Sequence, residues 1–419
     1  MRRLLYIMVF LFLSVQCYAQ QYAIDQMLEK SFIALSDSIL IKDDSTHELT
    51  VLYEMAKNKK IVAIGEVTHG TKEAMAFQKL IAANLVKRYG FKCIVLGEIS
   101  LLDAYKVNDF VVNQRGSIED FALKNRAQLR EIAYRQADLL ALYSSMWEYN
   151  KDKPFGDRAW IIGADIDEPK EVLSFINAYC QAQQMPNAIR IIETLNRNLR
   201  KMYTKTNIDA VVDDTNQLVG MLEGSRKGID SLEVKIDVMV HLLKVLPQLV
   251  AFSTDDDLKY KMRDKFIFDN IVWLIETCKK DKLVIIKAHN FHVNRKTIYT
   301  EVFGKFLSFG EYLSRGYQDD YLCIGTEVQQ GRFYTGATGS SRITQHKNKI
   351  GSIIGTNTKA QYGILFCDNN ARGFLNTEEI TVSFGTVNYK SSLLINAKGM
   401  LGDAFDVLIF IRNSTPYGL

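Results

Sequence analysis

Short apolar runs alternate with longer stretches of helical spacing along most of this chain. The apolar runs have the length and composition of buried strands, and they lie at residues 61–65, 93–97, 160–163, 283–288, 322–325, 364–367 and 407–411. Amphipathic helical patterns separate the early runs, at residues 72–89 and 129–149. Strands that are apolar throughout and alternate with helices are typical of α/β proteins. We therefore predict an α/β fold with a mainly parallel sheet flanked by helices.

One long segment lacks the strand pattern. Within residues 169–258, apolar side chains recur at helical spacing across 173–203, 208–222 and 229–252, with breaks at 224–228 and at Pro247. This pattern predicts a helical insertion of two or three long helices that forms a lid or wall over a cleft. The insertion divides an α/β hydrolase-like core into a first part, residues 20–168, and a second part, residues 259–419. A further helix at 259–279 returns the chain to the sheet.

The first residues have the features of a secretory signal peptide. Arg2 and Arg3 precede an apolar run at residues 4–15, and Ala19 offers a small residue before a cleavage point. The run is too short to span a bilayer comfortably. We expect a signal peptide at residues 1–19, cleavage after Ala19, a periplasmic or secreted protein, and no stable membrane span after signal removal.

The overall composition is that of a globular protein with a large core. Hydrophobic residues make up 47% of the 419 residues and charged residues 24%. The net charge of +4 is spread along the chain, which argues against a nucleic-acid partner. Of the 6 cysteines, Cys93, Cys323 and Cys367 lie in apolar runs and are predicted to be buried thiols. No CxxC pair occurs, so a disulfide framework is not expected, although a single bridge stays open.

Polar side chains with catalytic potential follow the first strand directly. Residues 61–73 read IVAIGEVTHGTKE, so Glu66, Thr68, His69 and Glu73 lie where a strand gives way to a helix. Ligands bind at the carboxyl ends of strands in open α/β sheets. Helix capping accounts for Thr68 as N-cap and for Glu73 in the first turn. It leaves Glu66 and His69 unexplained, so we interpret this segment as part of an active site.

Other strand ends carry similar groups. Glu98 ends the second strand, and Asp165 ends the third, with Asp167 and Glu168 just beyond. His289 and His292 follow the fourth. The helix before the fourth strand carries Arg263-Asp264 and Asn270, and Arg263 and Asn270, seven residues apart, form a stripe that could face the same site. The remaining histidines have no such setting and are predicted to be surface or packing residues; they are His47, His241 and His346.

These motifs, taken together and in order, resemble those of the erythromycin esterase family. The matching segments are residues 65–73 (GEVTHGTKE), Glu98 with Asp103, residues 147–150 (WEYN), residues 163–165 (GAD), Arg263-Asp264 with Asn270, residues 288–292 (AHNFH), residues 308–313 (SFGEYL) and residues 405–410 (FDVLIF). The sequence departs from the family at Gln78, near a position where many members have arginine, with Lys79 beside it. Glu148 likewise stands where arginine is common.

The resemblance implies a cleft in which water attacks an ester without a metal. Known members hydrolyse the macrocyclic ester of macrolide antibiotics, a resistance function. By the same resemblance His69 is the general base and Glu66 its orienting partner, while His289 and Glu98 position the water and stabilise charge. The residues implied to support the site or contact substrate are Glu73, His292, Arg263, Asp264, Asn270 and Asp165.

The chemistry of these residues leaves alternatives open. An imidazole held by a carboxylate can activate water, and no G-x-S-x-G nucleophile motif is present. We therefore expect a small-molecule ester as substrate and no cofactor. The same His and Glu residues could instead bind a divalent metal such as zinc, although the H-E-x-x-H pattern is absent. A non-catalytic periplasmic binding protein and a transferase acting on envelope polymers are the other hypotheses.

Overall fold

The computed structural model describes most of the chain and divides it into two compact units. The described residues are 2–41, 47–124, 136–199, 208–228, 230–276, 282–299, 307–335, 339–343, 348–377, 380–388 and 391–417. Unit 1 comprises Met1–Tyr89, Arg126–Ala141 and Val284–Leu419, and unit 2 comprises Gly90–Asn125 and Leu142–Leu283.

Unit 1 is built on a mixed sheet whose strand order is β1-β8-β11-β6-β2-β5, with β7 paired to β6. The strands are β1 (Phe32–Leu35), β2 (Ile61–Glu66), β5 (Leu283–His289), β6 (Tyr321–Thr335), β7 (Gly339–Ile343), β8 (Tyr362–Phe366) and β11 (Val407–Ser414). β6 runs parallel to both β2 and β11, in the registers Ile61↔Tyr321 and Val407↔Ile324. β8 is antiparallel to β11, and β1 is antiparallel to β8. A separate antiparallel pair contains β9 (Thr381–Asn388) and β10 (Ser391–Lys398).

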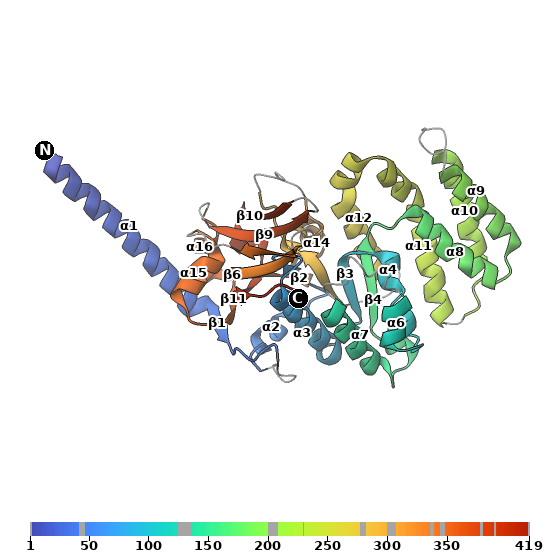
Figure 1. Ribbon diagram of the computed structural model, residues 1–419, viewed down its shortest axis with the longest axis horizontal. Coiled ribbons are helices and arrows are strands. Elements are labelled where there is room, and N and C mark those ends of the chain that lie inside the picture. Colours follow the sequence, from blue (N-terminus) through green and yellow to red (C-terminus); the bar gives the residue numbers. More distant parts are fainter. Residues whose placement is uncertain are drawn as a thin grey trace. The chain divides into compact units, whose positions relative to one another are not determined.

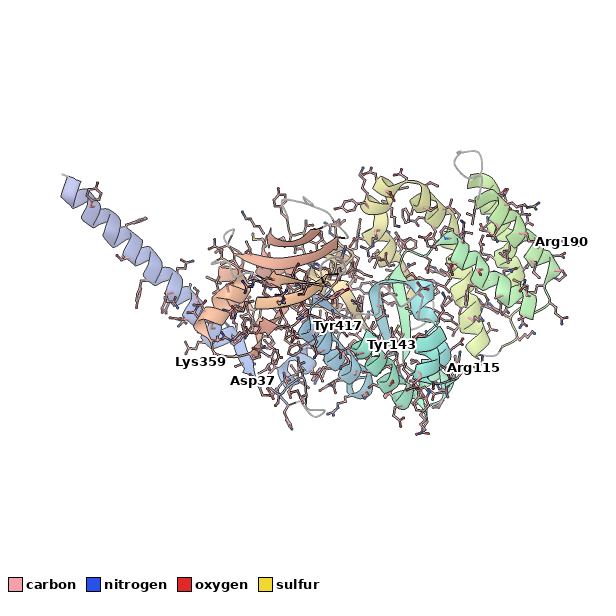
Figure 2. All side chains as sticks on the ribbon, viewed as in Figure 1. Asp37, Arg115, Tyr143, Arg190, Lys359 and Tyr417 are labelled. Atoms are coloured by element: carbon pink, nitrogen blue, oxygen red, sulfur yellow. The ribbon has the colours of Figure 1, made fainter. Side chains whose placement is uncertain are left out.

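Helices cover this sheet because its central strands are apolar along most of their length. Every residue of β2 and of β5 is buried. The helical elements of unit 1 are α1 (Arg2–Ser31), α2 (Thr50–Ala56), α3 (Lys72–Tyr89), α13 (Asn290–Val293), α14 (Phe309–Tyr317), η5 (Gln318–Asp320), α15 (Ile350–Asn357), α16 (Asn369–Leu375) and α17 (Leu401–Ala404). The C-terminal segment is fixed by the hydroxyl of Tyr417 (labelled in Figure 2), which donates to Asp138 Oδ2 at 3.0 Å.

Unit 2 contains one parallel strand pair and a large set of helices. β3 (Cys93–Ser100) runs parallel to β4 (Trp160–Asp165) in the register Cys93↔Trp160. The helical elements of unit 2 that precede β4 are α4 (Leu101–Tyr105), α5 (Asn108–Val111), α6 (Ile118–Lys124), most of α7 (Gln136–Asn150) and η3 (Phe155–Asp157). After β4 come α8 (Pro169–Ala182), α9 (Pro186–Leu199), α10 (Ile208–Gly224), α11 (Asp230–Thr254) and α12 (Asp256–Glu276). Figure 1 shows α8, α9, α10 and α11, in green, lying side by side, and each packs on its neighbours.

The predicted α/β fold is confirmed, and the strands predicted from the apolar runs are all present. The sheet is mixed because β1, β7 and β8 pair antiparallel at its edges, and two of these, β1 and β7, are too short or too polar to give an apolar run. β6 is much longer than the predicted run at 322–325, since it continues through Glu327 and Gln329 to Thr335. The predicted helix at 129–149 is seen from Gln136 onward, and residues 129–135 lie outside the described part.

Three local predictions in the helices were wrong. The described residues of the segment predicted to hold two or three long helices contain four, α8 to α11. The stretch of helical spacing at 173–203 is divided because Pro186 begins α9 after Gln183–Met185. Pro247 lies inside α11 and does not end it. Thr68 is not the N-cap of α3, which begins at Lys72; its hydroxyl lies 2.6 Å from that of Thr71. The function of the 169–258 segment as a lid or wall stays a prediction.

The cysteines and one long apolar helix have the following settings in the structure. Cys93, Cys323 and Cys367 are buried free thiols, as predicted, and Cys180 is a fourth. Cys278 lies outside the described residues. Among the described helices, Glu233–Thr254 of α11 is long and apolar enough to cross a membrane by length and composition, and 61% of its most apolar window is buried within the protein.

Candidate functional site

The end of β2 in unit 1 brings a buried carboxylate into contact with a half-buried imidazole. Glu66 is the last residue of β2 and is 1% exposed. His69 Nδ1 lies 2.7 Å from Glu66 Oε1, and the His69 side chain is 24% exposed. A carboxylate at this distance takes a hydrogen bond from Nδ1–H, so the neutral ring carries its lone pair on Nε2. Nε2 is therefore the nitrogen that can accept a proton from a reacting group.

Close packing of the backbone holds the β2 end in place. Asn290, the first residue of α13, donates from Nδ2 to Thr326 O at 2.7 Å and accepts from Thr326 N at 3.1 Å. The Thr326 hydroxyl in turn accepts the Val67 N–H at 2.8 Å. Gly65 allows this approach, because a Cβ there would lie 2.5 Å from Asn290 Oδ1. The position of Glu66 is thus fixed by contacts to α13 and β6.

Lys287 contacts the same carboxylate and was not among the residues predicted from the sequence. Its Nζ lies 3.0 Å from Glu66 Oε1, and both side chains are almost completely buried. Its φ of +53° places it in the left-handed region, which costs a non-glycine residue roughly 1–2 kcal/mol. Gln78 supports this backbone: its Oε1 accepts the Lys287 N–H at 3.2 Å and its Nε2 donates to Ile64 O at 2.7 Å. The available signal was a lysine inside an apolar strand, where charged residues are rarely buried without a partner.

His289 lies beside His69 but uses both ring nitrogens on the backbone. Its Nε2–H donates to Val67 O at 2.9 Å, and its Nδ1 accepts from Phe291 N–H at 3.3 Å as the N-cap of α13. The ring centroids of His69 and His289 are 5.2 Å apart, with an interplanar angle of 64°. The two imidazoles therefore meet as predicted. A role of His289 in positioning water, which stays a prediction, requires that a ring nitrogen leave its backbone partner.

Two other predicted residues of unit 1 have packing or bridging contacts. The His292 ring stacks on Phe309, with centroids 6.3 Å apart and planes 6° apart. Glu73, in the first turn of α3, accepts hydrogen bonds from Thr415 N at 2.9 Å and Thr415 Oγ1 at 2.6 Å. Glu73 therefore ties the C-terminal segment to α3.

The predicted residues of unit 2 form their own charged group. Arg263 on α12 binds Asp165 through Nε at 3.0 Å and through a terminal nitrogen at 2.5 Å, and the same terminal nitrogen lies 3.3 Å from Glu98 Oε1. Burial by itself lowers the pKa of Arg263, but the charges of Asp165 and Glu98 outweigh it and raise that pKa. The guanidinium is therefore always charged, and it joins the ends of β3 and β4.

Asn270 lies on α12 seven residues after Arg263, about two helical turns further along. It donates from Nδ2 to Ala164 O at 2.8 Å, and its Oδ1 lies 2.7 Å from His241 Nε2. His241 stacks on Trp273 with centroids 4.0 Å apart, and burial lowers its pKa to about 4. His241 is thus a neutral packing residue that donates to Asn270. Asp264 is also buried.

His47 and Asp167 lie outside the two groups described above. His47 is exposed, in line with its predicted surface setting, and His346 lies outside the described residues. Asp167 is buried and accepts the Leu102 N–H at 3.0 Å. Burial raises the pKa of Asp167 to about 7, against the opposing effect of hydrogen bonds from Leu102 and Ser100.

The groups at the β2 end are of the kind that can transfer protons. Among the described residues, no three His, Cys, Asp or Glu side chains are arranged to hold a metal ion. Glu66 Oε1 contacts an imidazole and an ammonium, and the His289 nitrogens contact the backbone. A carboxylate that orients an imidazole at the end of a strand is the arrangement of a general base and its partner.

Comparison with known sequences identifies related proteins. The sequence profile described as erythromycin esterase matches residues 86–414, a range that begins after Glu66 and His69. A curated relative is the erythromycin esterase type II of Escherichia coli, which is 22% identical over 321 residues; these cover 69% of this chain and 74% of the relative.

Solved structures share the fold over nearly the whole chain. A succinoglycan biosynthesis protein superposes with a TM-score of 0.75 at 16% identity, covering 95% of this chain and 98% of the other. A mutant of the erythromycin esterase EreC in its open conformation gives a TM-score of 0.63 at 14% identity, with coverages of 93% and 99%. At these identities the structural likeness concerns the fold alone.

Proposed function

Because this chain belongs to the erythromycin esterase family, we propose that it is an exported hydrolase that opens a carboxylic ester with water activated by His69. The substrate class is a lactone or other ester, and a macrolide antibiotic is the first compound to test, since the Escherichia coli relative is named as an erythromycin esterase. Hydrolysis of such an antibiotic would confer resistance on the producing cell.

The proposal depends on the pair Glu66–His69. His69 Nε2 takes a proton from water as the oxygen of that water attacks the ester carbonyl carbon. The resulting tetrahedral intermediate collapses, the carbon–oxygen ester bond breaks, and the imidazolium returns the proton to the leaving alkoxide. The products are a carboxylic acid and an alcohol, and Glu66 keeps the ring in the tautomer that each transfer needs.

Replacement of the base tests the proposal. We expect H69A to lower kcat by on the order of 10²- to 10⁴-fold against any ester that the wild-type protein hydrolyses in a panel of aryl esters, lactones and macrolides. H47A is the matched control, because His47 is exposed and we expect no change. Equal turnover by H69A and the wild-type protein would exclude His69 as the base.

Chelation tests the absence of a cofactor from the proposed reaction. We expect the protein to keep its ester hydrolysis after dialysis against a strong chelator, because the proposed proton transfer uses protein side chains and no metal ion. Loss of activity that zinc restores would contradict this part of the proposal and favour a metal-dependent hydrolase.

A further inference from the structure

The proposed base is connected to a buried lysine on another strand. Lys287 Nζ and His69 Nδ1 both contact the same atom, Glu66 Oε1, at 3.0 Å and 2.7 Å. Lys287 is 2% exposed, so it is covered by protein and does not belong to the surface that a substrate reaches. We therefore expect any effect of Lys287 on the reaction to pass through Glu66.

The backbone at Lys287 has an unusual conformation in the position from which its side chain contacts Glu66. The residue adopts a φ of +53° within β5, a conformation that L side chains rarely adopt, and Gln78 takes up the N–H of that position. Strained conformations of this kind persist where the surrounding structure enforces them, and they cluster at functional sites. A lysine with the ordinary backbone conformation of a strand would not carry this conformational cost.

The charges of the three groups suggest what the lysine does. With a neutral His69, the trio of Glu66, His69 and Lys287 has no net charge. A buried carboxylate without the ammonium would favour uptake of a proton by the Glu66–His69 pair, and an imidazole that already holds that proton cannot act as a base. We propose that Lys287 is a positioning residue that fixes the Glu66 carboxylate and offsets its charge, so that His69 stays neutral and able to accept a proton.

The elements that pack against β2 carry further charged or titratable groups. These elements are α3, α13, β5 and β6. Their groups include Glu73 and Lys79 on α3, His289 on β5, His292 on α13 and Glu327 on β6. Lys79 is bound to Asp138 at 2.5 Å, and His289 is neutral because one ring nitrogen donates to Val67 O while the other accepts from the backbone. Neither Lys79 nor His289 therefore offsets the charge of the Glu66 carboxylate, which is the function that we assign to Lys287.

The inference rests on the proposed function and is tested by the pH dependence of kcat/KM. K287M keeps most of the length of the unbranched side chain and removes its charge, whereas K287R keeps the charge. In K287M we expect a fall of roughly 10-fold or more in kcat at pH 7, little change in KM, and an acid limb that moves up by about one pH unit, because the pair now binds a proton more tightly. K287R should keep the acid limb of the wild-type protein.

A matched control separates this effect from the loss of any buried lysine. Lys349 is fully buried in the same unit, where its Nζ donates to Gln329 O at 3.0 Å and lies 4.0 Å from Glu327. K349M should change thermal stability and leave the pH profile unmoved. An acid limb that shifts equally in K349M and K287M, or that stays fixed in a folded K287M, would overturn the proposal.

A double variant and a second readout cover the remaining outcomes. If Lys287 acts only through Glu66, K287M should add no further shift in an E66Q background. NMR titration of the His69 ring, assigned with H69N, should show a higher midpoint in K287M even if no ester is turned over, so failure of the proposed function is distinguished from failure of this inference. If neither K287M nor K287Q folds while the wild-type protein does, Lys287 is purely structural and the proposal is wrong.

Discussion

Asp167 and Arg263 show how differently burial acts on single charged residues of unit 2. Arg263 is bound by two carboxylates, so its charge is retained in spite of burial. Asp167 is held by hydrogen bonds from Leu102 and Ser100, both neutral donors, and burial raises its pKa to about 7. A paired ion thus keeps its charge, while an acid held by neutral donors gives it up near neutral pH.

The raised pKa of Asp167 predicts a pH-dependent stability. Between about pH 4 and pH 7 the folded protein holds a proton that the unfolded chain has lost, so this residue makes stability fall as pH rises, by an upper bound of about 4 kcal/mol at pH 8. D167N keeps an acceptor for Leu102 N–H and never ionises. We expect its Tm, relative to the wild-type protein, to be higher at pH 8 than at pH 5.

Thermal unfolding of both proteins at the two pH values measures this difference. D157N is the matched control, because the Asp157 side chain in the same unit is 63% exposed, and we expect D157N to leave the pH dependence of the Tm unchanged. A Tm difference between D167N and the wild-type protein that is the same at pH 5 and pH 8 would show that Asp167 does not titrate in this range.

The sequence pattern could indicate the candidate residues at or just after the end of a strand, and it could not indicate Lys287, which lies in the interior of β5. Glu66 and His69 stand out because polar groups directly after an apolar run have no packing reason to be there. Lys287 belongs to an apolar run, and its partner Glu66 is 221 positions away in the chain. Pairing between such distant residues depends on the order of strands, which the amino-acid pattern does not contain.

At the scale of elements, the turn between β2 and α3 is closed by backbone contacts from two other segments. Gly70 O accepts hydrogen bonds from Tyr334 N and from Tyr417 N, both at 3.0 Å. A Cβ at Gly70 would lie 2.1 Å from Tyr334 O, so a side chain here would collide with the backbone of β6. The loop that carries His69 is therefore held by the end of β6 and by the C-terminal segment.

This geometry predicts that G70A is destabilising. The added methyl group must push the turn away from backbone atoms, and we expect a loss of about 1–3 kcal/mol in the free energy of unfolding, together with reduced ester hydrolysis because His69 moves. Urea unfolding measures the loss, and a G70A protein as stable as the wild-type protein would contradict this account.

Gly220 in α10 supplies the control for this substitution. Among the described residues, and apart from the backbone of its own helix, no atom lies within 4 Å of the position that an alanine methyl group would take there. Alanine has the higher helix propensity, so G220A should stabilise the protein by roughly 0.5–1 kcal/mol.

The predicted elements were right where a pattern was local and wrong where packing overrode it. α3 matches its predicted range because its apolar spacing runs unbroken from Lys72 to Tyr89. α11 continues through Pro247, although proline removes a helical hydrogen bond, because buried residues on both sides, such as Leu246 and Leu249, hold the helix in the unit. Tertiary contacts of this kind cannot be read from one segment.

At the scale of the whole molecule, each unit is assembled from segments that are far apart in the sequence. Unit 1 combines three segments, and the bond between Tyr417 and Asp138 joins positions 279 residues apart. The sequence indicated the α/β class because strands and helices alternate locally. It could not indicate this partition, which depends on contacts between distant segments.

The first helix of unit 1 changes character along its length, and this change bears on export. In its first part Tyr6, Phe12 and Val15 are exposed although they are apolar. Beyond Ala19, Ile24 and Met27 are buried, and α1 packs on α16 and α15. The change from exposed to packed side chains falls near the cleavage point proposed after Ala19.

Two truncations are therefore expected to behave differently. A protein that starts at Gln20 should keep the Tm of the full chain, because the described side chains that it loses are exposed, whereas one that starts at Phe32 should lose about 3–6 kcal/mol. That loss reflects the burial of Ile24 and Met27, roughly 1.5–3 kcal/mol each. Thermal unfolding of both truncated proteins measures the difference, and N-terminal sequencing of the protein isolated from producing cells tests the proposed cleavage after Ala19. Cleavage beyond Met27, or equal stability of the two truncations, would contradict the assignment of residues 20–31 to the folded unit.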